Sequence, residues 1–274
     1  TVLPRLETRG SLGLLMDEDK QIHVNYMPGT AQNVLFDESH EQANTLDWTR
    51  AQELNPEHPE WIYFGRMAED LSNQFTFTRN VDEPLTLALL QAYDLLVLAV
   101  PHNDFTAEEQ QAIHDYITLG GGVVVLGDCG MVHPANEFLD EYDILFEEHC
   151  LFSPAPDYDA DFWVTELWED APFDSIPSYF TNWPQFLPLG EPVLAWSDEA
   201  SWVDFNWSGD YDAGEETGPL ALGAAYDGGC GRLVAFADNA FQDDYYDTRV
   251  NTPFMRAMLT LAGGGQACEI EQNS

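Results

Sequence analysis

The chain has 274 residues, and 49 acidic against 9 basic side chains give it a formal net charge of -40. A field of that sign repels phosphate backbones, which excludes nucleic acids as partners and argues against binding to an anionic membrane surface. Because 45% of the residues are hydrophobic and 13% are aromatic, the chain can bury a core, which argues against disorder. Lys20 is its single lysine, and scarce lysine beside abundant acid is typical of proteins from salty surroundings.

Length and composition predict a single domain over residues 1–274, with an extended lead-in at 1–30. No apolar run reaches the length of a membrane span, because the longest runs, 95–100 and 123–126, suit buried strands. The chain also lacks a basic and then apolar signal-type start, so any export signal is expected to have been removed already or never to have been present.

Strands and helices are predicted to alternate along most of the chain. The patterns give strands at 34–36, 74–78, 94–100 and 123–126, and helices at 60–71, 85–92 and 106–119. Thr106 and Glu109 form a capping box at the start of the third helix, and Gly120 to Gly122 end it. This alternation predicts an α/β fold, a doubly wound and mainly parallel sheet of the flavodoxin-like kind with helices on both faces.

The regular alternation fails over residues 150–218, which are rich in aromatic and acidic residues and are interpreted as an irregular insertion. Strands at 192–196, 201–205 and 220–226 are expected as antiparallel additions near one edge of the sheet. A last core strand at 232–237 and a closing helix at 252–262 complete the domain.

Four cysteines allow three pairings if all are oxidised. Proximity in sequence favours Cys129 with Cys150, and Cys230 with Cys268, and such disulfides would place the protein outside the cytoplasm, in the extracellular space or at a cell surface. Two alternatives stay open for Cys129, which could be a buried free thiol or a nucleophile.

Polar residues follow the carboxyl ends of four predicted core strands, where ligands bind in open α/β sheets. These residues, called the strand-end rim below, are Asp37, Ser39 and His40, then His102, Asn103 and Asp104, then Asp128 and Cys129, and finally Asp238 and Asn239. Four strands therefore deliver acids, amides and imidazoles to one edge of the sheet.

Several segments carry a family resemblance. The first is residues 34–42, which contain the motif Asp37-x-Ser39-His40-x-Gln42. The others are the predicted strand 93–98, residues 120–128, residues 231–238, and Asn251. Over residues 31–149 and 219–263 the chain resembles the glutamine-amidotransferase-like domains of the gliding-motility and intraflagellar-transport type. The resemblance implies an amidotransferase-like fold whose catalytic residues are lost and whose rim faces a ligand. The ligand-binding residues expected there are Ser39, Gln42, His102, Asn103, Asp128, Asn239 and Asn251.

The sequence departs from a working amidotransferase in two respects. Such an enzyme needs a cysteine in a tight strand-to-helix turn and a downstream His and acid. Cys129 does follow a strand, but the end of the last core strand reads Asp238-Asn239 and has no His-x-Glu pair. An acidic field would also raise the pKa of a thiol and weaken it as a nucleophile.

Two oxygen-rich groups are candidates for a metal ion. Asp37, His40, Asp128 and Asp238 could converge as a mixed oxygen and nitrogen site, or Asp37, His40 and Asp238 could act as acid and base in a hydrolytic step. The structural alternative is that Asp37 caps the following segment and His40 bonds to it. Asp238, Asp243, Asp244 and Asp247 suit Ca²⁺, although their spacing does not match an EF-hand loop and a solvated acidic loop is the alternative. No nucleotide cofactor is expected.

Eight large aromatic residues lie close together in the sequence, interleaved with acids: Trp163, Trp168, Tyr179, Phe180, Trp183, Trp196, Trp202 and Trp207. They suit stacking on sugars or contact with a protein, or they cover the second face of the sheet. The leading hypothesis is an exported, noncatalytic binding or assembly domain that recognises a glycan or a protein and is stabilised by cations. The alternatives are a hydrolase, acting on polysaccharide for example, with its site at the rim, and a self-associating surface or filament subunit.

Overall fold

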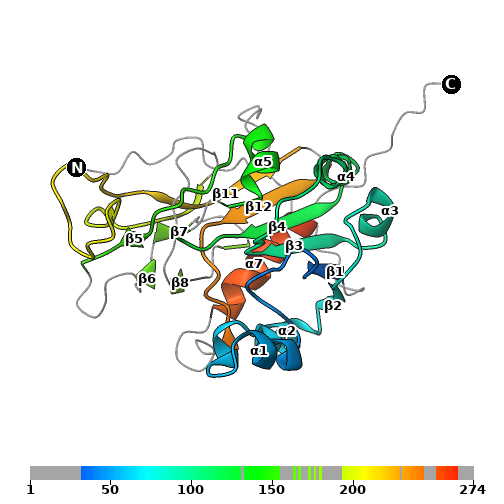
Figure 1. Cartoon of the computed structure of the whole chain (residues 1–274). Helices are drawn as coiled ribbons and strands as arrows, with labels where there is room; N and C mark the ends of the chain where they lie inside the picture. Colours follow the sequence, from blue (N-terminus) through cyan, green and yellow to red (C-terminus); the bar gives the residue numbers. More distant parts are fainter. Residues whose placement is uncertain are drawn as a thin grey trace.

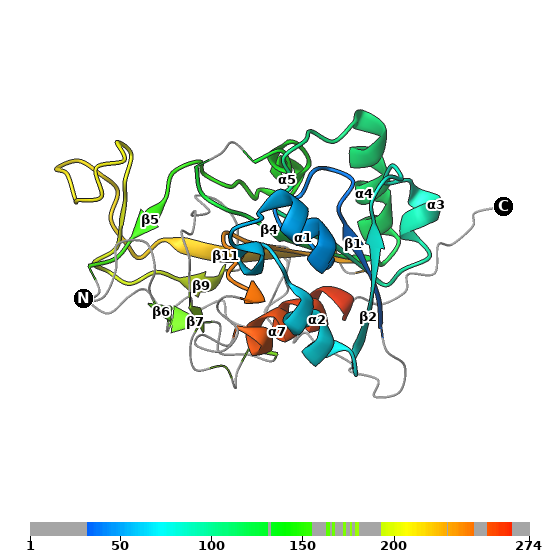
Figure 2. The same ribbon diagram turned by 60° about the horizontal axis from the view of Figure 1, so that its bottom comes forward.

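The computed structural model describes residues 32–130, 133–154, 193–228, 230–243 and 251–264, with the short stretches 163–164, 166–167, 172–173, 176 and 179–180. The predicted lead-in at 1–30 lies outside these residues. In the described part, helices lie on both faces of a central sheet (Figures 1 and 2). This is the α/β architecture that the alternation of strands and helices predicts.

The central sheet contains eight of the described strands, in the spatial order β2-β1-β3-β4-β12-β11-β9-β7. Their bounds are β2 Phe75–Asn80, β1 Gln32–Asp37, β3 Leu95–Ala99, β4 Gly122–Leu126, β12 Arg232–Phe236, β11 Ala221–Asp227, β9 Val193–Trp196 and β7 Glu166–Leu167. The first five run parallel to one another, and β11, β9 and β7 continue the sheet with antiparallel pairing. The antiparallel additions predicted at 192–196 and 220–226 are confirmed, whereas the strand predicted at 201–205 does not join this sheet. The parallel strands end together at one edge.

Successive side chains of the four inner parallel strands, β1, β3, β4 and β12, enter two different apolar cores. On β1, Val34 and Phe36 pack into the first core and Leu35 packs into the second. The helices of the first core are α2 (Gly65–Leu71) and α7 (Thr252–Gly263), and those of the second are α3 (Leu87–Leu90), α4 (Ala107–Thr118) and α5 (Asn136–Leu139). Figure 1 shows α4 and α5 on one side of the sheet and α2 and α7 on the other. Burial of both faces explains why these strands are continuous apolar runs.

Helix α4 forms where the sequence predicts it. Thr106 Oγ1 accepts a hydrogen bond from Glu109 N at 3.3 Å, and Glu109 Oε2 accepts one from Thr106 N at 3.0 Å, which completes the capping box. Gly120, just beyond the helix, has a φ of +106°, a conformation that L side chains rarely adopt. Because α4 starts after β3, the capping box holds Glu109 near the carboxyl edge of the sheet.

The prediction of a single helix over residues 60–71 is wrong. The structure has a 3-10 turn, η1 (Pro59–Trp61), followed by an interruption and then α2. Within the interruption, Ile62 O accepts a hydrogen bond from Thr45 N at 2.9 Å and Phe64 N donates one to Thr45 O at 3.0 Å. These backbone groups bond to a distant segment instead of a helix, and apolar spacing cannot reveal such a partner. The helix predicted over 85–92 shortens to the single turn α3.

Helix α1 (Trp48–Leu54) has no counterpart in the sequence prediction, nor do α5 and the 3-10 turn η2 (Asp140–Tyr142). Asp47 caps α1 and accepts hydrogen bonds from the first backbone N–H groups of the helix. Of the α1 residues only Ala51 is buried, so the helix leaves no apolar periodicity to detect.

Two small antiparallel ladders lie outside the central sheet. Strand β5 (Leu151–Phe152) pairs with β10 (Trp202–Val203), and β6 (Trp163–Val164) pairs with β8 (Tyr179–Phe180). The strand predicted over 201–205 is therefore shorter than expected. None of the helices in the described ranges combines the length and the apolar character that crossing a bilayer requires.

Candidate functional site

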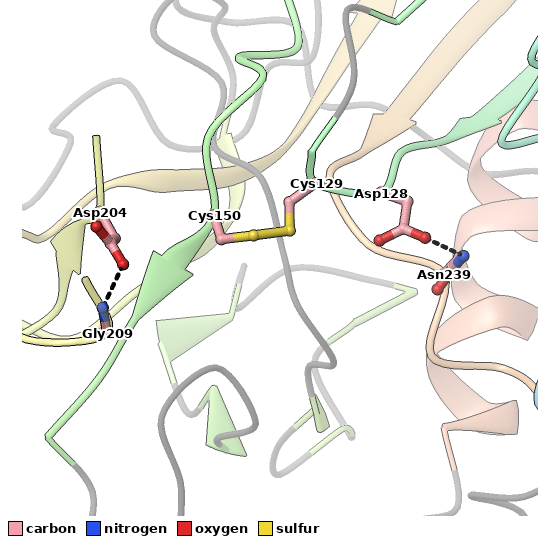
Figure 3. The surroundings of a disulfide bond; sticks show 6 residues. All are labelled: Asp128, Cys129, Cys150, Asp204, Gly209 and Asn239. Carbon is pink, nitrogen blue, oxygen red and sulfur yellow. Dashed lines mark hydrogen bonds between the residues drawn. A yellow bond between two sulfur atoms is a disulfide. The ribbon is translucent and has the colours of Figure 1, made fainter. Parts of the chain in front are cut away.

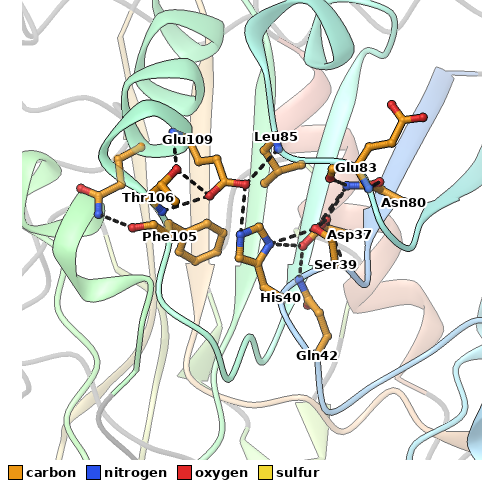
Figure 4. Close-up of polar contacts among 11 residues, drawn as sticks. Asp37, Ser39, His40, Gln42, Asn80, Glu83, Leu85, Phe105, Thr106 and Glu109 are labelled. Carbon is orange, nitrogen blue, oxygen red and sulfur yellow. Dashed lines mark hydrogen bonds and ion pairs between the residues drawn. The ribbon is translucent and has the colours of Figure 1, made fainter.

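Asp37, at the carboxyl end of β1, is the centre of a buried polar cluster (Figure 4). Four side chains bond to its carboxylate, with distances of 2.7 Å to Ser39 Oγ, 2.8 Å to His40 Nδ1, 2.9 Å to Gln42 Nε2 and 2.8 Å to Asn80 Nδ2. The Asp-x-Ser-His-x-Gln segment therefore folds back on its own aspartate. The bond between His40 and Asp37 is the one expected if these residues serve to fix the segment after β1 and do not bind a metal or catalyse a reaction.

His40 lies between two carboxylates. Its Nδ1 is 2.8 Å from Asp37 Oδ2 and its Nε2 is 3.4 Å from Glu109 Oε1, while its ring stacks on Phe105 at a centroid distance of 4.2 Å. Burial alone would lower the pKa of His40, but the hydrogen bond and the charge of Asp37, together with Glu109, raise it above its ordinary value. Both ring nitrogens thus face anions, which favours the imidazolium form and leaves no ring nitrogen to act as a base.

Glu109 joins α4 to this cluster. Burial would raise the pKa of Glu109, but hydrogen bonds from Thr106 and from Leu85 N, with the charge of His40, lower it below its ordinary value. The carboxylate is therefore held in its charged form, and its first-turn position in α4 adds the favourable dipole of a helix N-terminus.

A second polar cluster joins the ends of β4 and β12 (Figure 3). Asn239 Nδ2 lies 3.3 Å from Asp128 Oδ2 and 3.2 Å from Asn44 Oδ1, and Gln242 Nε2 donates to Asn239 Oδ1 at 2.9 Å. Burial raises the pKa of Asp128 to about 7, against the hydrogen bonds from Cys129 N and Asn239 that lower it. A carboxyl group with this pKa gains and loses a proton near neutral pH.

Cys129 is bonded to Cys150, which confirms the predicted pairing and rules out the free thiol and the nucleophile at Cys129. Cys150 is buried, and its carbonyl oxygen accepts a hydrogen bond from Asp204 N at 3.1 Å. The disulfide therefore ties the end of β4 to the β5–β10 ladder (Figure 3). Cys268 lies outside the described residues, so its pairing with Cys230 stays a prediction.

Other predicted ligand-binding residues occupy different places. The side chains of His102 and Asn103 are exposed beyond β3, and the backbone N–H groups of both donate to His40 O at 3.1 Å. Asn251 stands at the start of α7, where its Nδ2 donates to Ala240 O at 2.6 Å. The side chains of His102 and Asn103 are therefore solvent-exposed at the rim, whereas Asn251 links the start of α7 to Ala240.

Asp238 is separated from Asp37 and His40 by the order of the sheet. It follows β12, three strands from β1, which is roughly 14 Å at about 4.8 Å per strand. Its carboxylate accepts hydrogen bonds from Asn239 N at 2.6 Å and from Ala240 N at 3.1 Å. The three residues considered together as acid and base thus lie in two different clusters.

The described residues contain no group of three or more His, Cys, Asp or Glu side chains placed so that it could hold a metal ion. In the predicted Ca²⁺ site, Asp243 Oδ1 accepts a hydrogen bond from Arg66 N at 3.0 Å, while Asp244 and Asp247 lie outside the described residues. A Ca²⁺ site formed by Asp238, Asp243, Asp244 and Asp247 stays a prediction.

Residues 204–216, called the aromatic loop below, connect β10 towards β11 and expose three rings. Phe205, Trp207 and Tyr211 are 43%, 53% and 54% exposed. Trp207 has a φ of +60°, in the left-handed region that is rare for a bulky residue. A Cβ added to Gly130 would lie 3.4 Å from the Trp207 ring, so the loop reaches the segment that follows Cys129.

The other aromatic residues named in the sequence analysis differ in their surroundings. Trp202 is buried and stacks on Phe152, and Trp196 packs against the second core. The side chains of the remaining members, which are Trp163, Trp168, Tyr179, Phe180 and Trp183, lie outside the described part of the structure.

Four residues of the two clusters were not predicted, namely Glu109, Asn80, Asn44 and Gln242. Glu109 is visible in the sequence as the acidic member of a capping box, but the pattern does not say that its other oxygen faces His40. The contact from Asn44 to Asn239 joins residues 195 positions apart, and only the fold brings them together.

No protein-family model matches the chain, and no curated protein matches it. Among solved structures, it is similar to one described as "mmIFT52 N-terminal domain", with 15% identity, a TM-score of 0.65, and coverage of 86% of this chain and 100% of that domain. A putative ThuA-like protein from Bacteroides uniformis aligns at 13% identity with a TM-score of 0.48, over 86% of this chain and 94% of that chain. A second, from Parabacteroides merdae, aligns at 11% identity with a TM-score of 0.47, over 89% of this chain and 94% of that chain. The likeness to the first structure shows the fold, an α/β domain with a mainly parallel central sheet.

Proposed function

We propose that this chain is an exported, noncatalytic binding or assembly domain that recognises a glycan or a protein through the strand-end rim and the aromatic loop. The observation that carries the proposal is the bond between Cys129 and Cys150. A cysteine nucleophile must be a free thiolate, and Cys129 follows β4 at the point where an amidotransferase would hold that thiolate. A disulfide also fits an oxidising compartment outside the cytoplasm.

The contacts of His40 support the same proposal. A general base needs a lone pair directed at a substrate, whereas both nitrogens of His40 face the carboxylates of Asp37 and Glu109. The raised pKa of His40 further favours the protonated ring. The motif that looks most like a catalytic set is therefore well suited to fixing the loop after β1.

The aromatic loop supplies a surface for the partner. Exposed aromatic rings combine a large apolar face with little side-chain freedom to lose, so they are effective contacts for sugars and for proteins. Trp207 keeps a costly backbone conformation although about half of its side chain is exposed, so burial of the ring does not account for it.

One observation favours a hydrolase as the second candidate. The pKa of Asp128, raised to about 7 by burial, is the value that a general acid needs near neutral pH. Asn239 beside it could orient a substrate hydroxyl group. In this candidate the acid is Asp128, and His40 has only a supporting role.

The binding proposal is tested on an immobilised glycan panel and, for a protein partner, by measuring self-association of the chain in sedimentation. Trp207→Ala is expected to weaken binding about tenfold in whichever assay is positive, because truncating an aromatic anchor removes most of its contact energy. Trp61→Ala is the matched control, since Trp61 is 49% exposed but lies in η1. Equal losses in the two variants, or no binding in either assay, would contradict the proposal.

A further inference from the structure

The aromatic loop has the residue spacing of a Ca²⁺-binding loop. The EF-hand pattern takes oxygen ligands at positions 1, 3, 5, 7, 9 and 12 of a twelve-residue loop, with Gly at position 6. Counting Asp204 as position 1, these places hold Asp204, Asn206, Ser208, Asp210, Asp212 and Glu215, with Gly209 at position 6. The one departure is Ser208, where the pattern has Asp or Asn, and a serine hydroxyl is also an oxygen ligand.

The backbone of the loop agrees with this numbering. Gly209 has a φ of +77°, so position 6 is a turn that favours glycine. Its N–H donates to Asp204 Oδ2 at 2.7 Å (Figure 3), while the other oxygen of Asp204 accepts from Asn206 N at 3.2 Å and Ser208 N at 3.0 Å. The chain thus curls around the first carboxylate of the pattern.

The oxygens at positions 5, 7 and 9 already converge. Ser208 Oγ is 2.8 Å from the carbonyl oxygen of Asp210 and 3.3 Å from Asp212 Oδ2, and Asn206 Nδ2 is 2.7 Å from the same Asp212 oxygen. Ligands bound to one Ca²⁺ at 2.3–2.6 Å are roughly 3 Å apart, which is close to these spacings. The carbonyl of Asp210, rather than its side chain, is the group that the pattern uses at position 7.

Charge gives a second, independent reason to expect a cation. The loop carries five carboxylates, and the sequence has no lysine or arginine between Arg79 and Arg232. None of the ion pairs found among the described residues includes a carboxylate of this loop. Asp204 is completely buried, and the partners of its carboxylate in the described part of the chain are three backbone N–H groups, with no cationic side chain among them.

We propose that residues 204–215 form a Ca²⁺ site with ligands from the Asp204, Asn206, Ser208, Asp212 and Glu215 side chains and the Asp210 carbonyl. The proposal goes beyond the binding function and does not depend on it. The carboxylates of Asp204, Asp212 and Glu215 do not by themselves converge on one point in the described structure. Half of the proposed ligands are neutral oxygens. In addition, the Glu215 carboxylate accepts hydrogen bonds from Phe205 N and Asp212 N, at 3.2 and 2.8 Å. The partly buried Glu215 side chain would supply the last ligand after it turns away from these two N–H groups.

The site also explains the arrangement of the exposed rings. Phe205, Trp207 and Tyr211 occupy positions 2, 4 and 8, which supply no ligand. Ligand and ring positions therefore alternate, so that the ion would hold the inner side of the loop while the rings remain outside. A bound cation would fix the aromatic surface in one shape.

The test titrates the whole purified chain with Ca²⁺, and with Tb³⁺ as a luminescent probe excited through the nearby tryptophans, after treatment with a chelator. Wild-type protein is expected to bind Ca²⁺ and to unfold at a higher temperature with roughly millimolar Ca²⁺ than with equal Mg²⁺. Asp212→Asn and Glu215→Gln should each weaken Ca²⁺ binding by about tenfold or more.

Two neighbouring variants make the same charge change without removing a ligand. Asp210 contributes only its backbone carbonyl and Glu216 is exposed outside the pattern, so Asp210→Asn and Glu216→Gln should leave the Ca²⁺ affinity within about twofold. Unfolding temperatures in chelator show whether each variant is folded. The proposal is overturned if wild-type protein shows no Ca²⁺ effect beyond that of Mg²⁺, if all four variants lose affinity equally, or if only Asp243→Asn abolishes binding.

Discussion

Removing the ring of His40 is expected to destabilise the fold by about 3 kcal/mol, because the buried carboxylate of Asp37 would lose its main cationic partner. Urea unfolding of His40→Ala at neutral pH measures this loss. His58→Ala is the matched control, since His58 is exposed and pairs with Glu60 at the surface, and its effect should stay within about 0.5 kcal/mol. Similar small losses in both variants would contradict the role given to His40.

Asp128 makes stability depend on pH with a definite sign. Burial raises the pKa of Asp128 from 3.8 to about 7, so the folded state keeps the proton over a range in which the unfolded chain has released it. This contribution to stability is lost as the pH rises from about 4 to about 7. Asp128→Asn removes the ionisation, and the unfolding temperature of the variant relative to wild type should therefore rise between about pH 5 and about pH 8. A difference that stays constant with pH would show that the pKa of Asp128 is ordinary.

Individual site residues were predictable only where the contact is local. Asp37, Ser39, His40 and Gln42 lie in one short segment, and the sequence identified all four. Their outer partners come from other elements: Asn80 ends the neighbouring strand, and Glu109 belongs to α4. The spacing of the Ca²⁺ pattern in residues 204–215 is also visible in the sequence, whereas the Ca²⁺ ligands predicted from the sequence are the acids after the last core strand.

At the scale of secondary structure, buried strands were predictable because β1, β3, β4 and β12 are covered on both faces and are therefore apolar throughout. Helix α4 was predictable from its capping box. Helix α1 was not, since it buries only one side chain, and the interruption at Ile62 depends on a backbone contact with Thr45. Patterns in sequence record burial and capping, whereas they do not record backbone partners from distant segments.

The disulfide is expected to hold the β5–β10 ladder against the end of β4. Replacing Cys129 and Cys150 together by serine should lower the free energy of unfolding by about 3 kcal/mol, because the bond closes a segment of 21 residues in the unfolded chain. Hydrogen exchange should rise first in β5, β10 and the aromatic loop, while β1 and β3 stay protected. Uniform loss of protection over the sheet would contradict a local role for the disulfide.

Over the whole molecule, 49 acidic side chains far outnumber the 9 basic ones. The described ion pairs of arginine involve Arg50, Arg79 and Arg232, and the first two share Glu38. The long stretch between Arg79 and Arg232, which includes the rim after β3 and β4 and the aromatic loop, has no basic residue other than histidine. The charge that repels phosphate backbones also favours cations, and the aromatic loop is the place where the geometry suits one.

In the proposed function, the strand-end rim binds a partner and does not catalyse a reaction. The most direct measurement is turnover by the purified chain on a panel of glycoside, ester and amide substrates, with His40→Gln and Asp128→Asn measured beside it. We expect the wild type and both variants to show no turnover above buffer, since Cys129 is in a disulfide and His40 is held by two carboxylates. Turnover by wild-type protein that is abolished in Asp128→Asn would contradict it and would establish the hydrolase.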